Sequence, residues 1–273
     1  MSTSRIGLAS ALLFGVATSM VFAAERRAGE SFVYETTTRA KISGGSLPPQ
    51  AYKDQPVIVT TIDIATTAVD ADGSARAHVV KHAAPPGSFS PSQVKSWNLL
   101  QGHAEFDAKL TAAGALIVNV DDSYQASEAT ATGSKLTLRQ QADQIVAQAN
   151  DPAYQANNAA REVKGTFLIA NVVSLSAAAR KTLAVGDHWR SVVDGASYDL
   201  SVTGKQQYRG RDTVVLKVVY TMANNPNMSS SIDATAYYDQ TAGLVVGTHA
   251  VTTQDIAATG MHTVSTLELN LAQ

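Results

Sequence analysis

The sequence predicts a mainly β protein, with antiparallel sheets arranged as a half-barrel or curved meander in two related halves around a helical middle segment. Three observations favour this fold class. Stretches of alternating apolar and polar residues recur through both ends of the chain and are separated by Gly-containing turns. Apart from a short stripe at Val94, Trp97 and Leu100, helical spacing of apolar residues occurs in the middle of the chain. Charged residues make up only 16%, and Thr, Ser, Ala and Val dominate, as suits sheets with hydroxyl-bearing faces.

The first β half, residues 24–123, begins with a strand from Ser31 in which Phe32, Tyr34 and Thr36 share one face. Residues 43–56 contain Gly and Pro residues that weaken or block strand pairing, so a loop is expected there. The clearest hairpin of this half follows, with strands at 57–69 and 75–82 around the turn 70–73.

A short helix and a second hairpin complete this half. Ser90 can cap a helix with Pro91 in its first position and Gln93 completing a capping box. Strands are then expected at 104–110 and 115–120, around a turn that contains Ala113-Gly114.

The middle segment, residues 124–180, is predicted to be a helical linker. Residues 124–133 suggest a loop, the next stretch to about residue 149 has helical spacing, and 153–163 is partly helical. Residues 165–173 are apolar but short, so a strand and a buried helix are both open. Ser176 is a candidate cap for one further helical turn.

The second β half, residues 181–273, starts with the sequence Leu183 to Trp189, in which Gly186 suits a turn, Asp187 a local hydrogen bond and Trp189 a core anchor. His188 between them is expected to face solvent. Alternation then predicts strands at 198–202, 213–222, 231–238, 244–253 and 263–271.

The order of motifs repeats between the halves. Gly29-Glu30-Ser31-Phe32 matches Gly186-Asp187-His188-Trp189, the turn Asp72-Gly73 matches Arg209-Gly210, and Ala113-Gly114 matches Ala242-Gly243. A duplicated β unit explains this order, although any series of hairpins places Gly turns at similar intervals.

The segment Val185-Gly186-Asp187-His188-Trp189 and the closing hairpin motif from Asp239 to Gly243-Leu244 support a resemblance. With a β-rich first half and a helical middle, the chain resembles a family of functionally uncharacterised bacterial exported proteins. More loosely, it resembles the half-barrel proteins that carry lipoproteins and lipids across the cell envelope. The resemblance implies an envelope location and supplies no catalytic residues.

Residues 1–23 have the form of a secretory signal peptide: Arg5, an apolar run and small residues before a cleavage position after Ala23. A single membrane anchor is the alternative, whereas no later stretch is apolar for long enough to cross a membrane. A periplasmic or secreted location is therefore expected. Without Arg5, the 21 basic residues become 20 against 23 acidic ones, a net charge of −3. Such a balance gives no reason to expect nucleic acid as a partner.

Catalytic and metal-binding signals are weak. The chain has no Cys, which removes thiol nucleophiles and thiolate metal sites, and it has no Gly-x-Ser-x-Gly motif. His78 and His82 are expected about 13 Å apart along one strand face, too far to share an ion. His188, His249 and His262 are isolated in sequence. We therefore predict no catalytic residue, no metal site and no cofactor.

Trp97 and Trp189 are the candidate ligand-binding residues, each with core packing as the alternative. The leading functional hypothesis is a non-enzymatic exported envelope protein that binds an apolar or lipid-like molecule between sheet and helices. The alternatives are a structural or protein-interaction module that uses an exposed strand edge, and a hydrolase in which carboxylates converge with His188, His249 or His262.

Overall fold

A computed structural model describes residues 26–45, 55–121, 150–180, 182–222 and 228–272. Within them the protein is mainly β, with 55% strand and 18% helix. Eleven strands form one open antiparallel sheet in the order β5-β4-β3-β2-β1-β11-β10-β9-β8-β7-β6. The predicted fold class is confirmed, and the two halves share a single sheet.

The strands are β1 (Ser31–Gly44), β2 (Ile58–Val69), β3 (Ala75–Ala83), β4 (His103–Leu110), β5 (Leu116–Ile117), β6 (His188–Val193), β7 (Ala196–Tyr208), β8 (Arg211–Thr221), β9 (Met228–Asp239), β10 (Leu244–Ile256) and β11 (Met261–Leu271). The helices are α1 (Pro91–Trp97), the π-helical turn η2 (Asn98–Gly102), α4 (Pro152–Thr166) and α5 (Leu168–Ala178). The predicted signal peptide, most of the 43–56 loop and the predicted elements between residues 124 and 149 lie outside the described residues.

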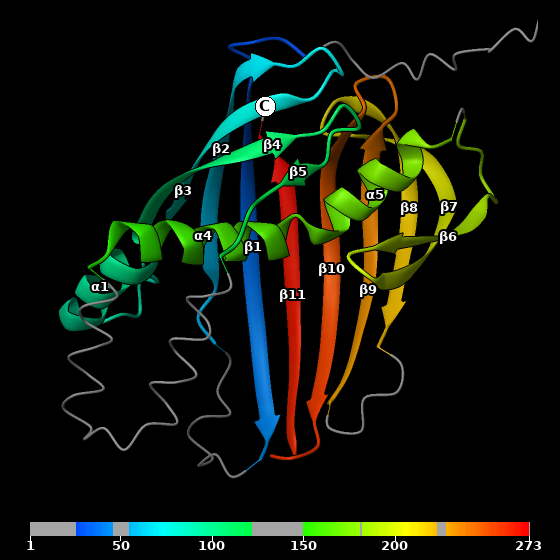
Figure 1. Ribbon diagram of the computed structural model, residues 1–273. Helices are drawn as coiled ribbons and strands as arrows, with labels where there is room; N and C mark the ends of the chain where they lie inside the picture. The colour runs from blue at the N-terminus through cyan, green and yellow to red at the C-terminus, as the bar shows by residue number, and fades with distance from the viewer. Residues whose placement is uncertain (1–25, 46–54, 122–149, 181, 223–227, 273) are drawn as a thin grey trace, which may run out of the picture.

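The sheet curves around α4 and α5, which lie across one face (Figure 1). We call this the helix face and the opposite one the outer face. In β1, the even-numbered side chains from Phe32 to Thr36 are buried, and Tyr34 meets Phe167, between α4 and α5, in an edge-to-face ring contact of 5.0 Å. Strand alternation therefore fixes which residues face the helices.

The ambiguous apolar stretch 165–173 is helical. It comprises the end of α4 and the start of α5, and most of the side chains of α5 are buried between the sheet and their neighbours. Asp151 caps α4 by accepting a hydrogen bond from the Ala153 amide at 2.9 Å, with Pro152 in the first position. The predicted role of Ser176 as a cap is wrong: it lies inside α5, and its hydroxyl donates to the Val172 carbonyl at 2.6 Å.

Two asparagines satisfy the backbone along one sheet edge. Asn171 of α5 accepts from the amide of Leu116 and donates to its carbonyl, both at 2.8 Å. Asn157 of α4 does the same for Asp121, at 2.7 and 3.0 Å. These amides occupy the hydrogen-bonding positions that an added strand would use, so the β5 edge is protected from further pairing.

The two halves repeat specific contacts as well as motifs. Gly29 donates to the Thr66 carbonyl while the Thr66 amide donates to Glu30, both at 2.8 Å. Gly186, Val202 and Asp187 repeat the same pair of bonds at 2.9 Å.

A β-bulge follows each of these pairs of bonds. The pairing register shifts between Thr66 and Ala68 in the first half and between Val202 and Gly204 in the second. The residue inside each bulge is a threonine, Thr67 or Thr203, whose hydroxyl donates to a carbonyl of the next strand. These matches favour a duplicated unit, in which β1–β5 correspond to β6–β10, and among the described residues β11 has no counterpart.

The aromatic anchors of the two halves are matched too. Phe32 and Trp189 each lie under an arginine: Arg26 is 5.4 Å from the Phe32 ring centre and Arg180 is 4.2 Å from the Trp189 ring. At the upper end of the sheet in Figure 1, the β4–β5 turn meets the β9–β10 turn, and a Cβ added at Gly114 would collide with the Gly243 carbonyl oxygen. The turns of the two halves are therefore in close contact at this end of the open sheet.

Candidate ligand-binding face

The helix face continues along β1, β11, β10 and β9 below the level of α4 and α5 (Figure 1). The continuous pairing of these strands places side chains in cross-strand rows. We call the lowest rows the uncharged face. Its rows are Met228, Ile256 and Met261; Ser230, Gln254, Thr263 and Ile42; and Ile232, Thr252, Ser265 and Ala40.

The side chains of the uncharged face are all aliphatic, thioether, hydroxyl or amide. Apart from Ile232, which is 9% exposed, they are only partly buried. Nearer the helices, the inward residues of the same strands, such as Ala236, Thr248 and Leu269, are buried, and α5 packs on β9 and β10. The uncharged face therefore extends a packed apolar surface beyond the helices that cover it.

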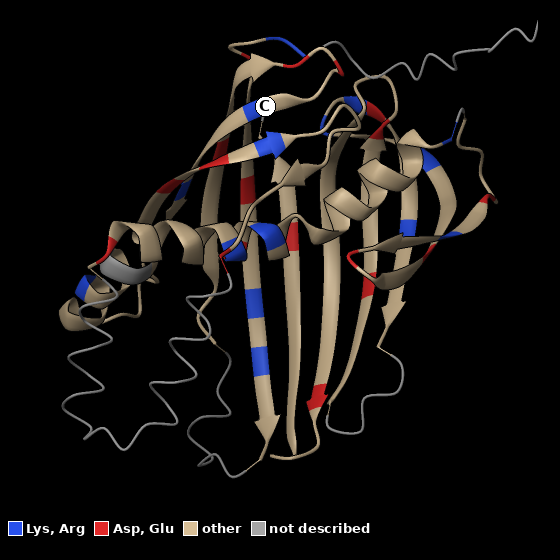
Figure 2. Ribbon diagram, in the orientation of Figure 1, with Lys and Arg blue, Asp and Glu red and all other residues tan. Residues whose placement is uncertain are grey.

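The charged residues in the lower parts of these strands, Arg39, Lys41, Asp233 and Asp255, occupy the alternate positions that face outward. Figure 2 shows Lys or Arg on the lower part of β1 and Asp or Glu on the lower part of β10. There, Arg39 pairs with Glu268 at 3.5 Å, and His262 lies 2.7 Å from Asp255. The hydrogen bond with His262 holds the pKa of Asp255 below its usual value. The two faces therefore differ in charge because the charged residues here occupy only the alternate positions that face outward, and not because the strands contain few charged residues.

The lower edge of the uncharged face borders a hollow of about 280 Å³. It is lined by Met228, Ile256 and Met261 of the uncharged face, by Ser229 and Asp255 of the outer face, and by Ala257 and Gly260 of the β10–β11 turn. Methionine side chains are flexible and polarisable, so they adapt to irregular apolar partners.

The two candidate tryptophans occupy different environments. Trp189 of β6 is 8% exposed and belongs to the main core. Trp97 of α1 is half-buried and lines a separate hollow of about 360 Å³. The two residues do not contribute to one site, and neither belongs to the uncharged face.

The histidines that could serve a hydrolase lie apart. His188, His249 and His262 occupy β6, β10 and β11 and are exposed or half-exposed on the outer face. His249 is 3.9 Å from Glu268, and His188 is exposed as expected. In the part of the chain that the structure describes, these three side chains do not converge on one cleft.

A further histidine cluster lies on the outer face of β3 and β4. His78 is 3.4 Å from Glu105 and 3.3 Å from Asp107, and His103 is 3.1 Å from Glu105. Among the described residues, no group of three or more His, Cys, Asp or Glu side chains is placed to hold a metal ion.

Lys81 is the one charged residue that strand alternation places inside β3. It is 3% exposed, forms an ion pair with Glu162 of α4, and donates to the Gln101 amide oxygen at 3.2 Å. Its partners explain how a buried ammonium is tolerated. The ion pair with Glu162 links α4 to β3, and the hydrogen bond to Gln101 links η2 to β3.

No model of a known protein family and no curated protein matches this chain. Over the described ranges, no helix is long and apolar enough to cross a membrane.

The sequence interpretation missed the uncharged face, although a signal was present. Every charged residue in 228–238, 250–256 and 261–271 falls at an outer-face position. These positions have odd numbers in the first two stretches and even numbers in the third. Sorting the residues of each expected strand into odd-numbered and even-numbered sets would have shown that one face has no charges.

Proposed function

We propose that this protein is a non-enzymatic, exported protein of the bacterial cell envelope that holds an apolar or lipid-like molecule on the uncharged face. The observation that carries the proposal is the separation of charge on β1, β11, β10 and β9. One face of these strands has the ion pairs, and the other, although partly exposed, has no charge.

An apolar ligand suits this surface. Aliphatic and methionine side chains supply contact area, because transfer of apolar surface from water is favourable by about 25 cal/mol per Å². The hydroxyl and amide groups of Thr252, Ser265 and Gln254 can orient a polar end of the ligand without requiring that it be charged. Apolar ligand sites commonly combine such a lining with a few polar groups.

The same lining supports a binding role over a catalytic one. None of the uncharged-face side chains titrates near neutral pH, so they offer no general acid or base. Asp255 and His262 lie 2.7 Å apart on the outer face, and Asp255 also lines the hollow at the lower edge of the uncharged face.

Two adjacent threonines of β10 provide the test. Thr252 lies on the uncharged face between Ile232 and Ser265, whereas Thr253 lies on the outer face, and both are half-buried. A lysine at position 252 would place an ammonium against apolar contacts, so Thr252→Lys should weaken binding of a fluorescent fatty-acid probe at least about tenfold, which corresponds to about 1.4 kcal/mol. Thr253→Lys should bind the probe as the unmodified protein does.

Native mass spectrometry of the protein from an envelope fraction completes the experiment. A co-purifying lipid on a chain that begins at Ala24 is the expected result. Absence of both lipid and probe binding, or equal weakening by the two lysine variants, would contradict the proposal. A stoichiometric protein in place of a small molecule would favour the interaction-module hypothesis.

A further inference from the structure

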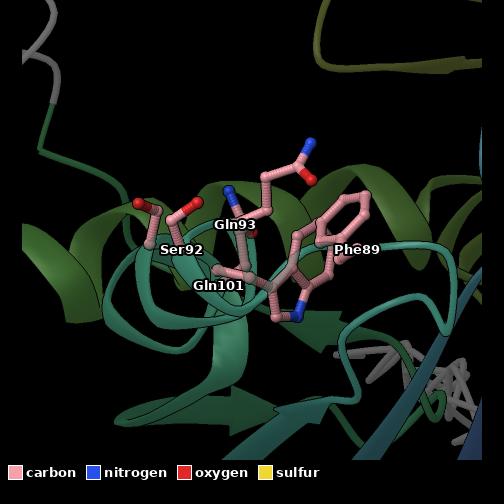
Figure 3. A pocket seen from close by; sticks show the side chains of 6 residues that line it. Phe89, Ser92, Gln93 and Gln101 are labelled. Carbon is pink, nitrogen blue, oxygen red and sulfur yellow. The ribbon is translucent and has the colours of Figure 1, made fainter.

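A second hollow lies beside α1, apart from the uncharged face. Its volume is about 360 Å³, at the lower end of the range for small-molecule sites. The lining side chains are two aromatics, two amides and two hydroxyls: Phe89, Trp97, Gln93, Gln101, Ser92 and Ser96. Figure 3 shows Phe89, Ser92, Gln93 and Gln101 around it.

The aromatic wall of this hollow is fixed in place. Phe89 and Trp97 meet edge to face with ring centres 5.6 Å apart and planes at 76°. The Trp97 indole N–H donates to the Ala83 carbonyl at 2.9 Å, so its orientation is tied to the end of β3. Both rings are only half-buried, so the apolar surface that they present is preorganised for a ligand.

The amide groups are held through their oxygens. The Gln93 oxygen accepts from the backbone amide and hydroxyl of Ser90 at 2.9 and 2.8 Å. The Gln101 oxygen accepts from Lys81 at 3.2 Å. These bonds orient each amide and present its NH₂ group as a donor, while the hydroxyls of Ser92 and Ser96 can donate or accept.

We propose that the hollow beside α1 binds a neutral saccharide. A pyranose ring has a C–H surface that can lie against an aromatic face, whose π cloud is negative, and a rim of hydroxyls that match amide and hydroxyl partners. The lining has no charged side chain, which selects against ligands whose charge would lose its hydration without compensation. This inference is independent of the apolar ligand proposed for the uncharged face.

The chain contains two tryptophans, so Trp189→Phe leaves Trp97 as the only indole reporter. Titration of this variant with glucose, N-acetylglucosamine and the disaccharide of N-acetylglucosamine should give a saturable fluorescence change, with Kd about 1 mM or lower for at least one of them. Saturation-transfer NMR with the unmodified protein provides the same comparison without a substitution.

Neighbouring positions on α1 separate binding from a general effect on the helix. Ser96→Phe fills the hollow and should weaken binding at least about tenfold. Lys95→Phe adds the same ring at an exposed position that does not line the hollow, and should leave the affinity within about twofold. The proposal is overturned if no saccharide saturates by about 50 mM, if both variants bind equally, or if adenosine binds as tightly as the saccharides, which would indicate a site for aromatic heterocycles.

Discussion

Replacing Gly114 with alanine tests whether the matched turns of the two halves hold the upper end of the sheet together. Gly114 has φ +85°, a conformation that costs a residue with a Cβ about 1–2 kcal/mol. The added methyl group would also collide with the Gly243 carbonyl and lie 3.0 Å from the Arg26 guanidinium. Both turns would have to separate, and overpacking of this kind costs about 1–3 kcal/mol. We therefore expect Gly114→Ala to lower the free energy of unfolding by about 2–5 kcal/mol.

Gly243 provides the matched control. It also has positive φ, at +62°, but a Cβ there would meet no described atom within 4 Å. Gly243→Ala should therefore lose only the conformational contribution of about 1–2 kcal/mol. Urea unfolding of both variants, with unchanged m values, measures the difference. Losses that agree within about 0.5 kcal/mol would refute the contact between the turns as a source of stability.

Two tyrosines give further predictions. Burial raises the pKa of Tyr34 from 10.0 to about 12, so stability that is present below pH 10 should be lost as pH rises toward 12, by up to about 2.7 kcal/mol. Tyr34→Phe loses the hydrogen bond to the Val245 carbonyl, which costs about 1 kcal/mol. Because phenylalanine does not ionise, the variant should lose up to about 2.7 kcal/mol less unfolding free energy than the unmodified protein between about pH 9 and pH 12, as measured by urea titration. An equal loss in both proteins would contradict this prediction. Tyr208 covers Gly247 on the outer face and donates to Asn270 at 2.5 Å. Tyr208→Ala should therefore cost about 2 kcal/mol and Tyr208→Phe about 1 kcal/mol in the same assay, and an unchanged urea midpoint for the alanine variant would rule out this role.

Local features of the fold could be predicted because neighbours in sequence determine them. The alternation placed Phe32 and Tyr34 on one face of a strand, and this face of β1 is buried. Gly186 and Asp187 form the expected turn: Gly186 has φ +96°, and the Asp187 carboxylate accepts from the Ala184 amide at 2.8 Å. Trp189 is a core residue, as its match with Phe32 suggested. In each case the deciding interactions lie within a few residues of the motif.

Features that depend on distant partners could not be predicted in the same way. Residues 165–173 are too short for periodicity to separate strand from helix, and the sheet against which they pack decided the outcome. The sequence does not explain a lysine at a buried position of β3, because its partners Glu162 and Gln101 come from other elements. The uncharged face needed the pairing of β1 with β11, which joins the two ends of the chain.

The position of the uncharged face follows from the unequal lengths of matched strands. β1 has 14 residues whereas β6 has 6, β10 has 13 whereas β5 has 2, and β9 has 12 whereas β4 has 8. β1, β10 and β9 form one run of neighbouring strands with β11, so the additional length of these three pairs lies where the two halves meet.

A sheet needs no such extension to cover α4 and α5, because the buried rows near those helices already do so. In these strand ends the outer face has ion pairs, whereas the opposite face has only uncharged side chains. The apolar ligand that we propose for the uncharged face would account for both the added length and its one-sided chemistry. The comparison of Thr252→Lys with Thr253→Lys therefore tests why these strands are long as well as what they bind.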